Sequence, residues 1–416
     1  MSCRMRAASS VSIESIRLSA ANRIPKSRKM RNFQPSGANF LELGYRIIVD
    51  FDGTKLSGAS MIQFGIPKLS WPPNQLKEGH MTFTRLSFAV VLTASLGLSA
   101  EAATAEELSV ATFLPPQHHT NTGMFTWFAE EIERRSGGSL TMKLYPAGQL
   151  GAGPVQQYKR VVEGVADIAF GVNAYTPAVF PKSMLGILPG KAVTADESTR
   201  AIWNVFDEHF ADEYKGVKVL AVGTVAGSLF IGNKDVSTLE GLQGTKLVPF
   251  AAMTTPIVEA LGAVPVQMPV TEMYTGLSTG TIDVITGSYN NVTQPWNFWD
   301  VSSHIVENVP VAFQVTYALM NEERYLGLSE EHRAIIDELS GLPMSLELAR
   351  SFDGADERSK KWISEATDKG YEWIIVSDEE RARMDAAVAA GLETIFADYE
   401  SRGVSGAREI YEALNQ

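Results

Sequence analysis

The chain has 416 residues, of which 45% are hydrophobic and 20% are charged, a composition that excludes a wholly disordered protein and allows two or three domains. Its charge is uneven: residues 1–80 carry 12 Lys and Arg against 5 Asp and Glu, whereas residues 103–416 carry 23 against 42. The excess of acidic residues over 103–416 disfavours nucleic-acid partners, because proteins bind nucleic acids through Lys and Arg at the phosphates. Because the one cysteine is Cys3, the remaining chain can form neither an internal disulfide nor a thiolate metal site.

A secretory signal is predicted inside the chain, over residues 81–102. After Met81 come a basic residue, Arg85, an apolar stretch over 86–98 and the small residues Ala100 and Ala102. About 13 apolar residues are too few for a bilayer, which needs roughly 20. We interpret residues 1–80 as lying upstream of the native start. The rival interpretation is a genuine basic leader resembling a transit peptide.

We therefore expect the native protein to begin near Ala103 as a secreted, periplasmic chain without a membrane anchor of its own. N-terminal sequencing of protein purified from the native periplasm measures this. Recovery of peptides from residues 1–80 in that material would contradict the expectation.

From Leu108 onward, short apolar runs alternate with amphipathic segments, which predicts an α/β fold with parallel strands covered by helices. One lobe is expected over about 103–222 plus a returning segment near 312–320, a second over about 223–311, and C-terminal helices over 330–416. The expected strands are 108–113, 140–145, 166–172, 217–223, 229–232, 245–250, 264–268, 283–285 and 312–320, the strand at 217–223 beginning the second sheet. The expected helices are 121–136, 155–163, 199–210, 257–261, 271–277, 330–369 with a break at 341–343, 378–399 and 407–414.

Several motifs follow one another in a recognisable order. They are Ser136-Gly137-Gly138, the run LYPAGQLG over 144–151, VEGVADI over 162–168, LEGLQGTK over 239–246, ALGAVPV over 260–266 and TGTID over 279–283. In this order and spacing they resemble the substrate-binding subunits of tripartite ATP-independent periplasmic (TRAP) transporters, the DctP family. The resemblance covers most of residues 107–320. It implies a two-lobed periplasmic-binding-protein fold with a long helix spanning both lobes, a hinge that closes on a small solute, and delivery to a membrane permease.

The residues that match the family's arginine positions are apolar here. Members of the family normally carry an arginine that pairs with a substrate carboxylate, and the resemblance places Val248 at that position. A second family arginine matches Leu229. A buried carboxylate without a partner costs several kcal/mol. The departure therefore favours a small neutral or cationic solute, such as an alcohol or amine.

Polar and aromatic side chains after the predicted strands are the candidate ligand contacts, because ligands of α/β proteins bind at the carboxyl ends of strands. The predicted ligand-binding residues are His118, Phe170, Asn173, Tyr175, Val248, Tyr289, Asn290 and Trp296. No cofactor and no metal is expected. A zinc site at His118 and His119 is disfavoured because neighbouring side chains point in different directions along an extended segment.

Two alternatives remain open. The first is an organic-acid receptor whose positive charge comes from Lys246, His118 or a helix N-terminus. The second is a secreted hydrolase, for which the sequence offers the GxSxG spelling around Ser278. A nucleophile elbow needs a strand before the serine and a helix after it, and the predicted order here is the reverse. A non-catalytic binding protein is the favoured interpretation.

Overall fold

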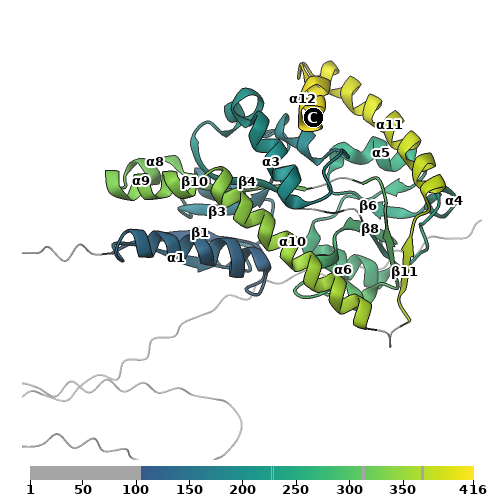
Figure 1. The fold of residues 1–416 in the computed structure, drawn as a ribbon, viewed down its shortest axis with the longest axis horizontal. Coiled ribbons are helices and arrows are strands. Elements are labelled where there is room, and N and C mark those ends of the chain that lie inside the picture. Colours follow the sequence, from purple (N-terminus) through teal and green to yellow (C-terminus); the bar gives the residue numbers. More distant parts are fainter. Residues whose placement is uncertain (1–104, 226, 228, 312–313, 367–369) are drawn as a thin grey trace, which may run out of the picture. The chain divides into compact units, whose positions relative to one another are not determined.

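The computed structural model describes residues 105–225, 227, 229–311, 314–366 and 370–416. The predicted signal at 81–102 and residues 1–80 lie outside the described residues. The described part forms one compact unit built on two sheets, each covered by helices (Figure 1). The α/β fold class is confirmed.

The first sheet has five strands in the order β2-β1-β3-β10-β4. β1 runs parallel to both β2 and β3, while β10 lies between β3 and β4 and is antiparallel to both. All five residues of β3 are buried, as expected for an apolar strand covered on both faces. The strands are β1 (Glu106–Ala111), β2 (Leu140–Tyr145), β3 (Ile168–Val172), β4 (Val217–Val225) and β10 (Gln314–Asn321).

The second sheet has six strands in the order β11-β9-β5-β8-β6-β7. They are β5 (Leu229–Gly232), β6 (Lys246–Val248), β7 (Val264–Pro265), β8 (Val284–Gly287), β9 (His304–Glu307) and β11 (Glu372–Ile375). The expectation that the strand at 217–223 begins this sheet is wrong. That strand is β4, which pairs with β10 from Val217 opposite Asn321 to Val225 opposite Gln314. An apolar run predicts a strand but carries no information about its partner.

The helices pack in layers on these sheets. In the first lobe α1 and α2 connect the parallel strands; in the second, α5 and α6 lie between strands (Figure 1). The α-helices are α1 (Thr126–Arg135), α2 (Gln157–Val162), α3 (Ala195–Val205), α4 (Leu239–Leu242), α5 (Thr255–Ala260), α6 (Val270–Thr279), α7 (Tyr289–Val292), α8 (Glu322–Leu326), α9 (Glu330–Leu339), α10 (Leu342–Glu365), α11 (Asp378–Ser401) and α12 (Ala407–Leu414). Short π or 3₁₀ turns lie at η1 (Asn121–Phe125), η2 (Asn173–Tyr175), η3 (Ser183–Ile187), η4 (Phe206–Phe210), η5 (Ala211–Tyr214), η6 (Ala252–Thr254) and η7 (Phe298–Val301).

The long helix α10 joins the two lobes. It packs against β4 and α3 of the first lobe and against α7 of the second (Figure 1). The predicted break before it falls at Gly341, which has φ +75°, and Pro343 follows within the first turn, where its missing N–H costs nothing. Buried Met344, Leu348 and Phe352 recur every four residues and form its inner face. The predicted helix spanning both lobes is confirmed.

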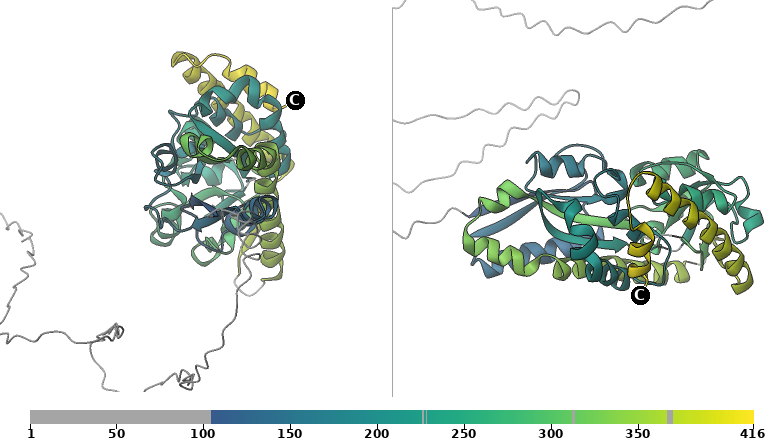
Figure 2. Two further views of the ribbon diagram at one scale, coloured as in Figure 1. Left: turned by 90° about the vertical axis from the view of Figure 1, so that its left-hand side faces the viewer. Right: turned by 90° about the horizontal axis from the view of Figure 1, so that it is seen from above.

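The C-terminal helices return across both lobes (Figure 2): α11 packs against α5 and α12 against α3. At the first of these contacts Gly391 lies so close to α5 that a Cβ atom there would be 2.7 Å from Ile257 Cα and 2.9 Å from Ile257 N. Such distances involve backbone atoms, which cannot rotate away. Glycine is therefore required here by packing.

We expect Gly391→Ala to lower the free energy of unfolding. Alanine gains about 0.5–1 kcal/mol of helix propensity, but pushing α11 off α5 costs about 1–3 kcal/mol, so the net change is a loss. Gly354→Ala on α10 is the matched control, because a Cβ there meets only the mobile Arg358 side chain, at 3.3 Å. Thermal or urea unfolding measures both. A Gly391→Ala variant as stable as Gly354→Ala would disprove the close packing.

Candidate ligand-binding site

A cavity of about 270 Å³ lies between the two lobes. Its walls come from the carboxyl ends of β1, β3, β6 and β8 and from the segments that follow them, the edge at which parallel strands present ligand sites. β4, α6, β10 and α10 also contribute. The lining residues are Phe113, Leu114, His118, Val155, Phe170, Val172, Ala174, Tyr175, Val225, Pro249, Phe250, Ala251, Ala252, Gln267, Met268, Pro269, Val270, Met273, Ile285, Thr286, Asn290, Asn291, Trp296, Phe298, Gln314, Thr316 and Phe352.

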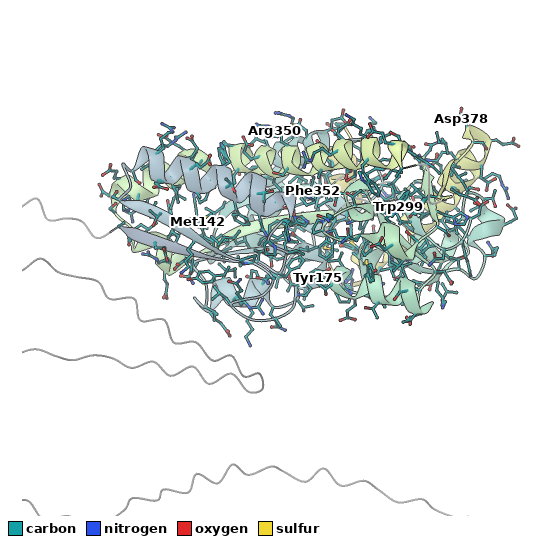
Figure 3. All side chains as sticks on the ribbon, turned by 90° about the horizontal axis from the view of Figure 1, so that it is seen from below. Met142, Tyr175, Trp299, Arg350, Phe352 and Asp378 are labelled. Atoms are coloured by element: carbon teal, nitrogen blue, oxygen red, sulfur yellow. The ribbon has the colours of Figure 1, made fainter. Side chains whose placement is uncertain are left out.

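The walls are largely apolar and include seven Phe, Tyr and Trp rings. The ring of Phe113 lies 6.2 Å from that of Phe170 and 6.3 Å from that of Tyr175, the latter edge-on. The His118 ring meets Trp296 and Phe352 edge-on, each at 5.9 Å. In Figure 3, Phe352 lies on the inner side of α10 and Tyr175 on the opposite side of the interior. A flat apolar solute would find ring faces and edges on several sides.

Among the described lining residues there is no Asp, Glu, Lys or Arg; His118 is the only group that can become charged near neutral pH. Its Nδ1 accepts a hydrogen bond from the backbone N–H of Thr120 at 3.2 Å, so the neutral ring carries its proton on Nε2 and can donate from there. Burial, and then the neighbouring His119, hold the pKa of His118 well below its usual range. The described lining side chains therefore carry no formal charge at pH 7.

Tyr175, Thr286 and Asn290 are three further polar side chains of the lining, which also contains Gln267, Asn291, Gln314 and Thr316. The Tyr175 hydroxyl accepts from the backbone N–H of Val270 at 3.3 Å and keeps its own proton for donation, and burial raises its pKa. Thr286 Oγ1 donates to the carbonyl of Val248 at 2.9 Å and keeps its lone pairs as acceptors. Asn290 Nδ2 donates to Asp356 at 2.6 Å, which leaves Oδ1 as the acceptor. The cavity thus offers both donors and acceptors without formal charge.

The structure brings five of the predicted ligand-binding residues together in this cavity: His118, Phe170, Tyr175, Asn290 and Trp296. The other three, Asn173, Val248 and Tyr289, are not among its lining residues.

Each of these three has another environment. Asn173 donates to the Tyr214 hydroxyl at 2.8 Å, Val248 packs in the apolar core of the second lobe, and Tyr289 lines a separate groove. Asn173 and Tyr289 each lie next to or near a lining residue in sequence, but neighbouring side chains point in different directions.

Sequence reasoning missed several aromatic lining residues. Phe113 and Phe250 each lie at or just after a predicted strand end, so the rule that selected Phe170 could have found them. Phe352 lies on α10, far along the chain, and its helical spacing indicates only a buried face. No local pattern distinguishes a buried helix residue that faces a ligand from one that faces the core.

His119, beside His118, and Ser278 are the residues of the metal and hydrolase interpretations. The described residues contain no group of three or more His, Cys, Asp or Glu side chains that could hold a metal ion. The His119 ring lies 4.0 Å from that of His118 and edge-on to Phe352, and burial followed by Arg358 lowers the pKa of His119 to about 3. Ser278 lies near the end of α6, where its hydroxyl donates to the carbonyl of Thr275 at 2.9 Å.

A sequence profile of bacterial extracellular solute-binding proteins of family 7, DctP, matches residues 110–398. The chain belongs to this family. The outer membrane transporter protein TsaT of Comamonas testosteroni is 26% identical over 339 residues, which cover 80% of this chain and 98% of TsaT. The ectoine- and 5-hydroxyectoine-binding periplasmic protein UehA of Ruegeria pomeroyi is 25% identical, over 77% of this chain and 94% of that protein.

Solved structures of TRAP solute-binding proteins share the fold. A marine metagenome protein specific for aromatic acids, in complex with metahydroxyphenylacetate, superposes with a TM-score of 0.69 at 27% identity, covering 74% of this chain and 97% of the other. A protein from Rhodoferax ferrireducens with copurified benzoate gives 0.69 at 26% identity, covering 74% and 96%. The predicted TRAP-type family and two-lobed fold are confirmed. No helix in the described part of the chain has the length and apolar character to cross a membrane.

Proposed function

We propose that this solute-binding protein captures a small uncharged aromatic compound in the periplasm and delivers it to a TRAP membrane permease without chemical change. The observation that carries this proposal is the lining of the interlobe cavity, which is mostly apolar, includes seven Phe, Tyr and Trp rings and contains no Asp, Glu, Lys or Arg among its described residues. Ring faces and edges supply affinity, and His118, Tyr175 and Asn290 supply hydrogen bonds to one polar substituent. Closure of the two lobes would bury the solute.

The absence of formal charge from the described lining argues against both an anion and a cation. A carboxylate or an ammonium moved from water into this cavity loses several kcal/mol of hydration, and no described lining side chain of fixed opposite charge replaces it. Asp356 does not line the cavity, and it already accepts hydrogen bonds from the backbone N–H and one side-chain N–H of Asn290. Of the two ligand classes expected from the sequence, these observations support a neutral solute more strongly than a cationic one.

An aromatic carboxylate is the second candidate, favoured by the two relatives of similar fold whose bound ligands are aromatic acids. Here the positive charge would come from a proton taken up by His118, which lies in the wall with its Nε2 not engaged in any hydrogen bond recorded for the described residues. The two candidate solutes both contain an aromatic ring and differ in charge.

Three ligands with the same ring and different charges separate the candidates: benzamide, benzoate and benzylamine. At pH 8 we expect benzamide to bind at least about tenfold more tightly than either charged compound, because it keeps the ring and avoids the cost of burying charge. Isothermal titration calorimetry measures the affinities, and mass spectrometry of the recovered ligand tests for turnover. Cyclohexanecarboxamide is the control that removes aromaticity alone. Preference for benzoate would select the second candidate, and binding of none of the three would refute the aromatic assignment.

A further inference from the structure

Helix α10 carries two carboxylates one turn apart, and each binds the beginning of a helix in a different lobe. Asp353 accepts hydrogen bonds from the backbone N–H groups of Ala195 at 3.0 Å and Asp196 at 3.2 Å, in the first turn of α3. Asp356 Oδ1 accepts from the backbone N–H of Asn290 at 2.7 Å and from its side-chain Nδ2 at 2.6 Å, in α7. Since α3 packs on β4 and α7 follows β8, the pair ties α10 to both lobes.

Only the second of these contacts reaches the ligand cavity. Asn290 lines the cavity, and its amide group has two N–H hydrogens, which go to Asp356 and to Ser288 Oγ at 2.5 Å. With both donors occupied, the carbonyl oxygen of the amide is the group left for a ligand; it accepts a long hydrogen bond from Asn291 Nδ2 at 3.5 Å and keeps a second lone pair. Asp353 and its partners Ala195 and Asp196 do not line the cavity.

Asp356 also faces a second space, a groove of about 830 Å³ separate from the ligand cavity. The carboxyl is thus placed between solvent on one side and a ligand-contacting amide on the other. The charged residues that line this groove with it are Lys191, Asp196, Glu307, Asp353, Glu357, Lys360 and Arg381. Of the two lysines, Lys360 is already paired with Glu307 at 3.2 Å.

Burial raises the pKa of Asp356 to about 7, an effect that the Asn290 hydrogen bonds partly oppose and the charge of Asp353 reinforces. In the unfolded chain this carboxyl has its ordinary pKa of about 3.9. Between about pH 4 and 7 the folded chain therefore keeps a proton on Asp356 that the unfolded chain has lost. The contribution of this group to folding stability is present at low pH and falls as the pH rises through that window. Ionisation of Asp356 in the folded chain therefore lowers the free energy of unfolding.

We propose that Asp356 is a positioning residue for the ligand site: in its ionised form it orients the Asn290 amide toward the solute, and in its protonated form it releases that amide and weakens binding. This inference rests on the proposed function for the identity of the cavity's occupant. The carboxylate form is the stronger acceptor because hydrogen bonds to an ionised group are roughly twice as strong as neutral ones. Ligand affinity should then rise with pH through about pH 7.

The test compares the full chain with Asp356→Asn and with the matched variant Asp353→Asn, using benzamide as the probe because it does not titrate. We expect benzamide to bind the unmodified protein about three- to tenfold more tightly at pH 8.5 than at pH 5.5. Asp356→Asn should show the low affinity at every pH and a higher melting temperature at pH 8.5. Asp353→Asn should keep the rise in affinity with pH, with its midpoint moved to lower pH because the charge of Asp353 no longer raises the pKa of Asp356. An unchanged profile in Asp356→Asn would overturn the proposal.

A second measurement does not depend on the ligand. In ¹⁵N-labelled protein without ligand, the backbone and side-chain N–H signals of Asn290 should titrate with a midpoint near pH 7 and should not titrate in Asp356→Asn. In Asp353→Asn they should still titrate, with a midpoint at lower pH because one neighbouring negative charge is removed. Absence of that titration in the unmodified protein would refute the role of Asp356. Titration without benzamide binding would leave Asp356 coupled to Asn290 and refute the proposed solute instead.

Discussion

Replacing Trp296 with alanine is expected to lower the affinity for an aromatic ligand roughly 30- to 700-fold, equivalent to about 2–4 kcal/mol. Trp296 lines the cavity, contacts His118 edge-on at 5.9 Å and packs against the apolar cores of both lobes. Its removal takes away a ring surface and one of the contacts between the lobes. Calorimetric titration with the tightest-binding of the three benzene compounds measures the loss.

Trp362→Ala provides the matched control for this prediction. Trp362 lies on α10, is 45% exposed and does not line the cavity, so its removal deletes the same side chain at a different place. We expect an affinity within about twofold of the unmodified protein, since exposed substitutions away from a site change free energies by about 0.5 kcal/mol or less. Equal losses in the two variants, or loss of cooperative unfolding in Trp296→Ala without ligand, would contradict the assignment of Trp296 to the ligand wall.

The second large effect is on pH dependence. If benzoate binds, its affinity should fall by as much as about tenfold for each pH unit from pH 6 to 8, because binding the anion must place a proton on His118. The affinity falls with rising pH because the pKa of His118 is lowered. At these pH values the ring is neutral before benzoate binds, so its proton must come from solution, where protons become scarcer as the pH rises. Benzamide needs no such proton, and its affinity should not fall over this range.

Proton uptake on benzoate binding can be measured directly, from the dependence of the calorimetric heat on the ionisation enthalpy of the buffer. We expect His118→Gln, which keeps an N–H donor but cannot be protonated, to abolish the fall in benzoate affinity with pH. His209→Gln serves as the control, because His209 lies in η4 away from the cavity, and it should keep the fall. A benzoate affinity that is independent of pH in the unmodified protein would show that another group compensates the carboxylate.

Much of the local architecture could be predicted from the sequence, because the signals are short in range. The strand at 140–145 matches β2 residue for residue, and the apolar run before Asn173 predicted β3. The break at Gly341 and Pro343 was predicted because a positive φ and a proline each act on the backbone at their own position. The motifs that indicated the family are likewise turns and strand ends, whose chemistry is local.

The candidate site could be predicted only in part. His118, Phe170, Tyr175, Asn290 and Trp296 line the cavity from strand ends or from the loops after them, where the fold presents ligands. Where a side chain points within such a segment depends on backbone angles that a single sequence does not reveal. For that reason Asn173 and Tyr289 were predicted together with Tyr175 and Asn290 as ligand contacts, although neither lines the cavity.

By itself, the sequence determined most of the helices and strands, though not β9 or β11, together with the two-lobed family fold and the lack of the arginines expected at Val248 and Leu229, since each depends on residue type and spacing along the chain. Only the tertiary structure decided that β4 pairs with β10, that Phe352 reaches the ligand cavity, and that Asp356 binds Asn290. These contacts join segments separated by tens to hundreds of residues. Their partners are selected when the whole chain packs, because many segments of similar apolar pattern could satisfy the same local preference.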